Sequence, residues 1–129
     1  MHMRLLGIDY GRKKMGLAIS EGILAKPLCV MRYSDAKTLN EKIRRIIKRF
    51  EIEKVVVGVS EGEMGEESKN FSQSLGRKLQ IPVETFDETL STHDAQRASI
   101  EAGIKRKKRK DMEDAYAATL TLQEYLDSN

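Results

Sequence analysis

The chain has 129 residues, 40% of them hydrophobic and 33% charged, and its 23 basic and 20 acidic side chains give a formal net charge of +3. This length predicts one domain spanning residues 1–129. The apolar runs are far shorter than the roughly 18 residues of a membrane span, the N-terminus carries no signal-peptide pattern, and the single cysteine, Cys29, excludes a disulfide framework and a cysteine metal site. We therefore expect a soluble, cytoplasmic protein without a membrane partner.

Hydrophobic periodicity and turn residues predict strands over 3–9, 15–20, 23–33, 54–59 and 82–86. The third strand is expected at an edge of the sheet because Pro27 lacks a donor for the ladder. Helices are expected over 35–50, 66–79 and 91–102, and from Asp111 to the C-terminus. Asp111 is expected to cap this final helix. The buried stripe of that helix is expected to consist of Met112, Tyr116, Thr119, Leu122 and Leu126.

The order of these elements, β-β-β-α-β-α-β-α-α, predicts an α/β fold with a mixed five-stranded sheet and helices on both faces. An antiparallel meander followed by alternating helices and strands resembles the ribonuclease H-like architecture. In an open α/β sheet, ligands gather beyond the carboxyl ends of the strands. That edge is therefore where we expect the functional site.

Basic residues gather in clusters, and such clusters suit a polyanion, most often nucleic acid. Six consecutive cations occupy 105–110, and a second cluster occupies 12–14. A third cluster, on the helix predicted over 35–50, is interpreted as a solvated face. The stretch 61–67 is acidic instead. Contacts to backbone phosphates are predicted for Arg12, Lys13, Lys105, Arg106, Lys107, Lys108, Arg109 and Lys110.

Three carboxylates are expected at the carboxyl edge of the sheet. Asp9 ends the first strand, Glu88 follows the last strand, and Asp114 lies in the first turn of the final helix. Converging carboxylates repel one another unless a cation neutralises them, and oxygen ligands without His or Cys favour Mg²⁺ or Mn²⁺. Two such ions can activate a water and stabilise the leaving oxygen of a phosphodiester. The sequence predicts a two-metal phosphodiester hydrolase in which these three acids bind metal and carry catalysis.

Each acid also has a structural interpretation. Asp9 is a reasonable turn residue, and Asp114 stabilises the positive end of the helix dipole. Asp87 is an alternative to Glu88. Asp111, three residues before Asp114, is an alternative to Asp114. The small residues at 117–118 favour Asp114, because they allow the final helix to approach the sheet closely.

The sequence is similar to the YqgF/RuvX family in five blocks: GIDYGRKKMGLAIS (7–20), VVVG (55–58), DETLST (87–92), EAGIKRKKRK (101–110) and DAYAATLTLQEYL (114–126). Members of this family are small bacterial ribonuclease H-like proteins to which processing of precursor 16S rRNA, and earlier the resolution of Holliday junctions, is ascribed. The resemblance covers almost the whole chain in the correct order. It implies that the family's catalytic acids fall on Asp9, Glu88 and Asp114, and that the substrate is structured RNA.

The chain departs from the family pattern at two places. Thr89 stands where the family usually has arginine, and 59–65 carries acids where the family has a mostly neutral loop. Two alternatives to the pre-rRNA nuclease therefore stay open. One is a resolvase of four-way DNA junctions, which needs two active sites and hence a symmetric dimer. The other is a non-catalytic RNA-binding factor of ribosome assembly. The expected oligomeric state is a monomer or a weak homodimer.

Overall fold

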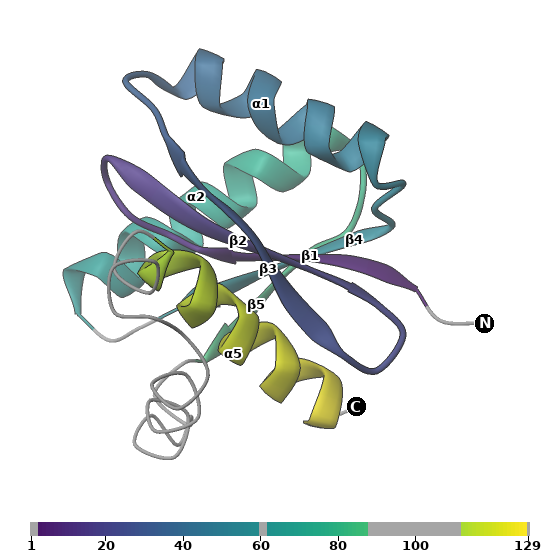
Figure 1. The fold of residues 1–129 in the computed structure, drawn as a ribbon. Coiled ribbons are helices and arrows are strands. Elements are labelled where there is room, and N and C mark those ends of the chain that lie inside the picture. The colour runs from purple at the N-terminus through teal and green to yellow at the C-terminus, as the bar shows by residue number, and fades with distance from the viewer. Residues whose placement is uncertain (1–2, 60–61, 88–111, 129) are drawn as a thin grey trace.

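The structure is a computed structural model that describes residues 3–59, 62–87 and 112–128. A five-stranded sheet lies between helices (Figure 1). Its strands are β1 (Arg4–Asp9), β2 (Lys14–Glu21), β3 (Ala25–Arg32), β4 (Lys54–Val59) and β5 (Val83–Asp87). The helices are α1 (Ala36–Arg49), α2 (Glu63–Leu79) and α5 (Glu113–Ser128). The helix expected over 91–102 lies outside the described residues.

The sheet is mixed, with the strand order β3-β2-β1-β4-β5. β1, β2 and β3 form an antiparallel meander, whereas β4 and β5 run parallel to β1. The predicted mixed sheet is thereby confirmed, and so is the edge position of the third strand. Pro27 lies opposite Ala18, where the pairing of β2 with β3 shifts its register. A residue without an N–H donor is tolerated at such an irregularity on an edge strand.

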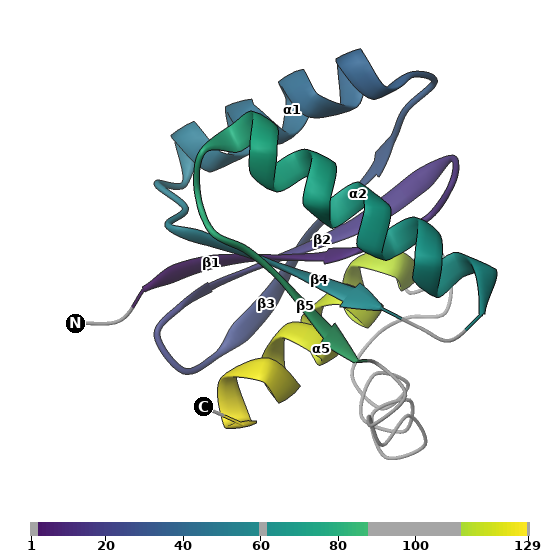
Figure 2. The same ribbon diagram turned by 180° about the vertical axis from the view of Figure 1, so that it is seen from behind.

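Helices cover both faces of the sheet, α1 and α2 on one and α5 on the other (Figures 1 and 2). Because successive side chains of a strand point to opposite faces, β1 contributes to two cores. Leu6 and Ile8 pack in the larger core with α1 and α2. Leu5 packs in the smaller core with Leu122 and Tyr125 of α5. The sheet is thus the central layer of three, as the element order predicts.

The buried face of α5 differs from the predicted one. It consists of Ala115, Ala118, Thr121, Leu122 and Tyr125. Of the five residues expected there, only Leu122 is fully buried, and Met112, Tyr116, Thr119 and Leu126 are half-buried. The prediction was wrong because it placed the larger apolar side chains against the sheet. The helix instead turns its small residues inward, since Gly7 of β1 brings the two backbones close together.

The three helices begin in different ways. Asp35 caps α1, with its Oδ1 accepting a hydrogen bond from the amide of Thr38 at 2.7 Å. α2 begins at Glu63, three residues before the predicted start, and its first turn carries acids that favour the positive end of the dipole. At the start of α5, the carbonyl of Met112 accepts from the amide of Tyr116 at 3.0 Å. Asp111, the predicted cap of this helix, lies outside the described residues.

Within 3–59, 62–87 and 112–128, the structure contains no helix long and apolar enough to cross a membrane.

Candidate active site

The first candidate acid, Asp9, lies at the carboxyl edge of the sheet. β1, β4 and β5 run parallel, and their last residues at this edge are Asp9, Val59 and Asp87. Asp9 pairs with Gly16 of the antiparallel strand β2 and with Gly58 of the parallel strand β4. The half-buried Asp9 therefore lies between two residues that carry no side chain.

Alternation along β1 places Asp9 on the α5 face of the sheet. Leu5 belongs to the core under α5, and a Cβ on Gly7 would lie 2.9 Å from the Cβ of Leu122 in α5. Asp9 follows at the next position of the same parity, so its side chain points to this face. The acid is thus directed toward the side on which α5 begins.

The second candidate acid, Asp114, is brought to the same edge by a close approach of backbones. A Cβ on Gly16 would lie 1.7 Å from the carbonyl oxygen of Asp114 and 2.7 Å from the amide nitrogen of Ala115. Only glycine permits this distance between β2 and the first turn of α5. Gly16 is also the cross-strand partner of Asp9. Asp9 and the backbone of Asp114 therefore both lie beside this glycine. The predicted close approach of the helix to the sheet is therefore confirmed, and Gly16 permits it at the first turn of α5 as Gly7 does further along the helix.

Lys14 provides a positive charge at this point. Its Nζ lies 3.2 Å from Oδ2 of Asp114, and the two side chains are 48% and 31% exposed. Lys14 precedes Gly16 by two residues and shares its face of the sheet. Lys14 belongs to the basic cluster 12–14, but no local pattern predicts this ion pair, because it joins residues 100 positions apart in the chain.

Asp87, the residue before the predicted ligand Glu88, lies on the other face of the sheet. Phe86 of β5 packs with the core under α5, so Asp87, the next residue, points toward α2. There it lines a cavity of about 280 Å³ with Thr85, Glu66 and Lys69. Asp87 therefore does not join Asp9 on the α5 face. Glu88 and the basic run 105–110 lie outside the described residues.

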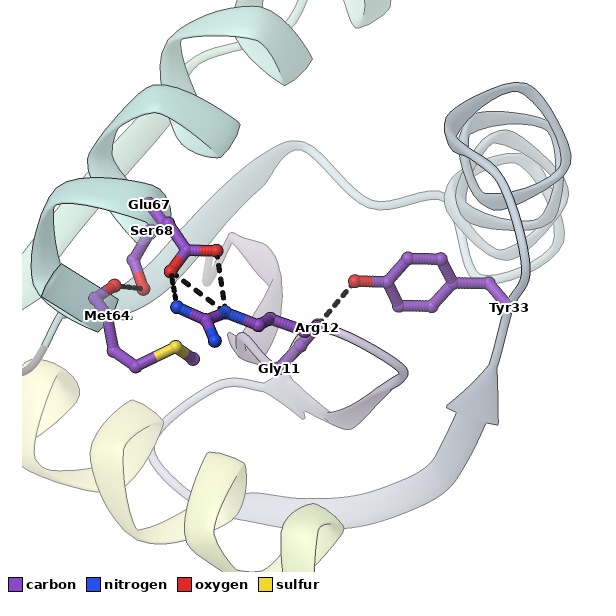
Figure 3. Close-up of polar contacts among 6 residues, drawn as sticks. All are labelled: Gly11, Arg12, Tyr33, Met64, Glu67 and Ser68. Atoms are coloured by element: carbon purple, nitrogen blue, oxygen red, sulfur yellow. Dashed lines mark hydrogen bonds and ion pairs between the residues drawn. The ribbon is translucent and has the colours of Figure 1, made fainter.

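Arg12, a predicted phosphate contact, is held by Glu67 of α2 (Figure 3). Its Nε donates to both carboxylate oxygens of Glu67 at 3.0 Å, and its Nη2 donates to Oε2 at 2.5 Å. This hydrogen bonding raises the pKa of the Arg12 guanidinium and lowers the pKa of the Glu67 carboxyl. Nη1 points away from Glu67 in Figure 3. The exposed guanidinium is therefore oriented while part of it faces outward.

The loop that carries Arg12 and Lys13 is itself anchored. The hydroxyl of Tyr33 donates a hydrogen bond to the carbonyl of Gly11 (Figure 3). The amide of Tyr33 donates to the carbonyl of Lys13 at 3.2 Å. Burial is the main cause that raises the pKa of Tyr33 to about 12. Sequence reasoning missed both Tyr33 and Glu67, since no local pattern signals a contact across 22 or 55 residues.

The donor set suits a hard divalent cation. Asp9 and Asp114 offer carboxylate oxygens on one face, and such ligands favour Mg²⁺ or Mn²⁺. In the part of the chain that the structure describes, no group of three or more Asp, Glu, His or Cys side chains is placed to hold a metal ion. Two of the three predicted ligands are therefore described on one face, and the third, Glu88, stays a prediction.

Comparisons with known proteins agree with this architecture. Residues 3–128 match the family model described as "RuvX: Holliday junction resolvase". The chain is 38% identical over 132 residues to a protein of Halothermothrix orenii named "Putative pre-16S rRNA nuclease", with 96% of this chain and 94% of that protein covered. It is 39% identical over 135 residues to a protein of the same name from Thermoanaerobacter pseudethanolicus, with coverage of 98% and 97%.

Solved structures show the same fold at lower identity. A complex of Thermus thermophilus RuvC with a Holliday junction substrate matches with a TM-score of 0.66 and 19% identity, covering 98% of this chain and 96% of that one. The fowlpox virus Holliday junction resolvase matches with a TM-score of 0.64 and 16% identity, covering 98% and 100%. The predicted ribonuclease H-like fold is thereby confirmed.

Proposed function

Because the chain belongs to the RuvX family, we propose that it is a divalent-metal-dependent nuclease that acts on structured RNA and processes the 5′ end of precursor 16S rRNA. Relatives that cover nearly the whole chain bear the name of a pre-16S rRNA nuclease, which supports this substrate. The fold is one that other nucleases share. The proposal therefore assigns a phosphodiester as the reacting group and ribosome biogenesis as the setting.

The observation that carries the proposal is the placement of Asp9 and Asp114 about Gly16. Asp9 is the cross-strand partner of this glycine, and the backbone of Asp114 fills the space that its Cβ would take. Asp9, Asp114 and Glu88 would hold Mg²⁺ or Mn²⁺. When bound, the metal would activate a water and stabilise the leaving oxygen of the phosphodiester. The acids themselves supply the negative charge that retains the cation.

Binding of the nucleic acid is assigned to cations around this edge. Arg12 and Lys13 lie exposed on the loop between β1 and β2, within four residues of Asp9 in the chain. Glu67 orients the guanidinium of Arg12 and leaves Nη1 directed away from the pair. The run 105–110 would add further contacts to backbone phosphates. Such contacts read the shape of an RNA rather than its sequence.

A second candidate function is the resolution of four-way DNA junctions. The description of the family model favours it, because it names that activity. Junction cleavage by symmetric incisions needs two active sites and therefore a dimer. A third candidate is a non-catalytic RNA-binding factor, which would bind RNA through the same basic residues without cleaving it.

One experiment separates the three candidates. A precursor 16S rRNA fragment and a four-way DNA junction are incubated side by side with the protein, in Mg²⁺ and in chelator. The proposal predicts Mg²⁺-dependent cleavage of the RNA near its mature 5′ end. Cleavage confined to the junction would establish the resolvase instead. Binding of the RNA without cleavage, by a protein that also leaves the junction intact, would establish the binding factor.

A further inference from the structure

The ion pair between Lys14 and Asp114 links the start of β2 to the start of α5. This contact places a protein cation against a predicted metal ligand, with Nζ 3.2 Å from Oδ2. Both side chains are partly exposed, so each can exchange its partner without burying a charge. The lysine therefore lies where an incoming cation would have to bind.

The position of this lysine is fixed by the same packing that positions the acids. Lys14 and Gly16 lie on one face of β2, and the backbone of Asp114 occupies the space beside Gly16. Two acids in the first turn of α5, Glu113 and Asp114, add to the negative charge of Asp9 at this edge. The Lys14 ammonium group offsets part of that charge while no metal is bound.

We propose that Lys14 is the internal counter-ion of Asp114 and is displaced from it by the divalent cation, an inference that rests on the proposed metal site. A Mg²⁺ ion about 2.1 Å from Oδ2, with Nζ still 3.2 Å from the same oxygen, would be at most about 5.3 Å from the ammonium, the sum of the two distances. Cations that close repel each other. The lysine therefore leaves the carboxylate when the metal enters.

Displacement has a consequence for the substrate. Once released, the ammonium group is a mobile point charge beside the metal site. Lys14 directly follows the loop that carries Arg12 and Lys13. It is then available to a backbone phosphate of the nucleic acid. Lys14 thus partly neutralises the carboxylate of Asp114 before the metal binds.

The test measures binding of Mn²⁺ to the full chain without nucleic acid. Lys14→Met removes the ammonium and keeps an unbranched side chain as far as Cε. Lys26→Met is the matched control: it makes the same change in net charge on an exposed lysine, paired with Ile19 toward the other end of the β2–β3 hairpin. Asp114→Asn reports whether the site itself exists. Mn²⁺ affinity is read by electron paramagnetic resonance, and melting temperature in chelator and in Mn²⁺ is the second measurement.

The inference predicts that Lys14→Met binds Mn²⁺ about three- to tenfold more tightly than the wild type, while Lys26→Met stays at the wild-type affinity. It also predicts that Lys14→Met melts below the wild type in chelator and that Mn²⁺ removes this difference. Equal or weaker affinity in Lys14→Met, with Asp114-dependent binding in the wild type, overturns the inference and leaves the metal site intact. Failure of the wild type to bind Mn²⁺ through Asp114 overturns the proposed site, and the inference with it.

Discussion

A methyl group on Gly16 is expected to push the start of α5 off the sheet and disable the candidate site. Its Cβ would lie 1.7 Å from the carbonyl oxygen and 2.1 Å from the carbonyl carbon of Asp114. These are backbone atoms, so a change of rotamer does not relieve the clash, and ordinary contact at 3.4 Å requires a displacement of about 1.7 Å. Overpacking on this scale costs about 3 kcal/mol of unfolding free energy. Misplacing a reacting group by about 1 Å lowers the rate of cleavage about a hundredfold.

Gly7→Ala is the matched control, since Gly7 also faces α5. Its Cβ would lie 2.9 Å from the Cβ of Leu122, only about 0.5 Å short of ordinary contact, so the expected cost is about 1 kcal/mol with Mn²⁺ affinity retained. Urea unfolding gives the free energies, and Mn²⁺ titration with the cleavage assay reports on the site. If Gly16→Ala were as stable as Gly7→Ala and bound Mn²⁺ like the wild type, the close approach of α5 to β2 would be refuted.

The remaining predictions concern single acids and the basic run. Asp114→Asn is expected to lose Mg²⁺-dependent cleavage and Asp111→Ala to keep it; the reverse pattern in Mg²⁺ titrations of activity would transfer the ligand role to Asp111. Replacing 105–108 by Gln is expected to reduce the slope of log K against log salt by about 1.4–2.8 for single strands, if two to four of these side chains contact phosphates, and an unchanged slope would make the run a solvated loop. The hydrogen bond from Lys54 lowers the pKa of Glu84 below its ordinary 4.5, so the pair stabilises the fold above pH 4.5 and this contribution is lost as the pH falls through the folded-state pKa. Urea unfolding at a series of pH values should therefore show a shallower acid loss for Glu84→Gln, and curves parallel to the wild type would contradict that role.

Sequence patterns predicted the sheet well because its signals are local. The run 54–59 of β-branched residues is a strand with the predicted bounds, buried between two layers. The strand 3–9 and its partner 15–20 were also predicted within one residue at each end. Helix α1, Ala36–Arg49, lies within one residue of the predicted range 35–50 at each end. In each case neighbouring residues carry the whole signal.

The packing of α5 and the contacts of the loop between β1 and β2 depend on distant residues. The predicted stripe of α5 was wrong because the glycines of β1 and β2, rather than the largest apolar side chains, decide which face meets the sheet. The ion pairs Arg12–Glu67 and Lys14–Asp114 form because the fold brings residues that are distant in the sequence together beside the β1–β2 loop. Packing about Gly16 places Asp9 and Asp114 at the edge that the sequence predicted, and their roles as metal ligands stay a prediction.

Cleavage by Asp9→Asn tests the metal-dependent mechanism most directly. Asparagine is nearly isosteric with aspartate and lacks the charge that holds a divalent cation, so the melting temperature should stay near that of the wild type. The rate of Mg²⁺-dependent cleavage of the precursor 16S rRNA fragment should fall by about three orders of magnitude, because loss of a metal ligand removes several kcal/mol of transition-state stabilisation. A variant that cleaves at the wild-type rate would contradict the assignment of Asp9 to the metal and, with it, the proposed active site.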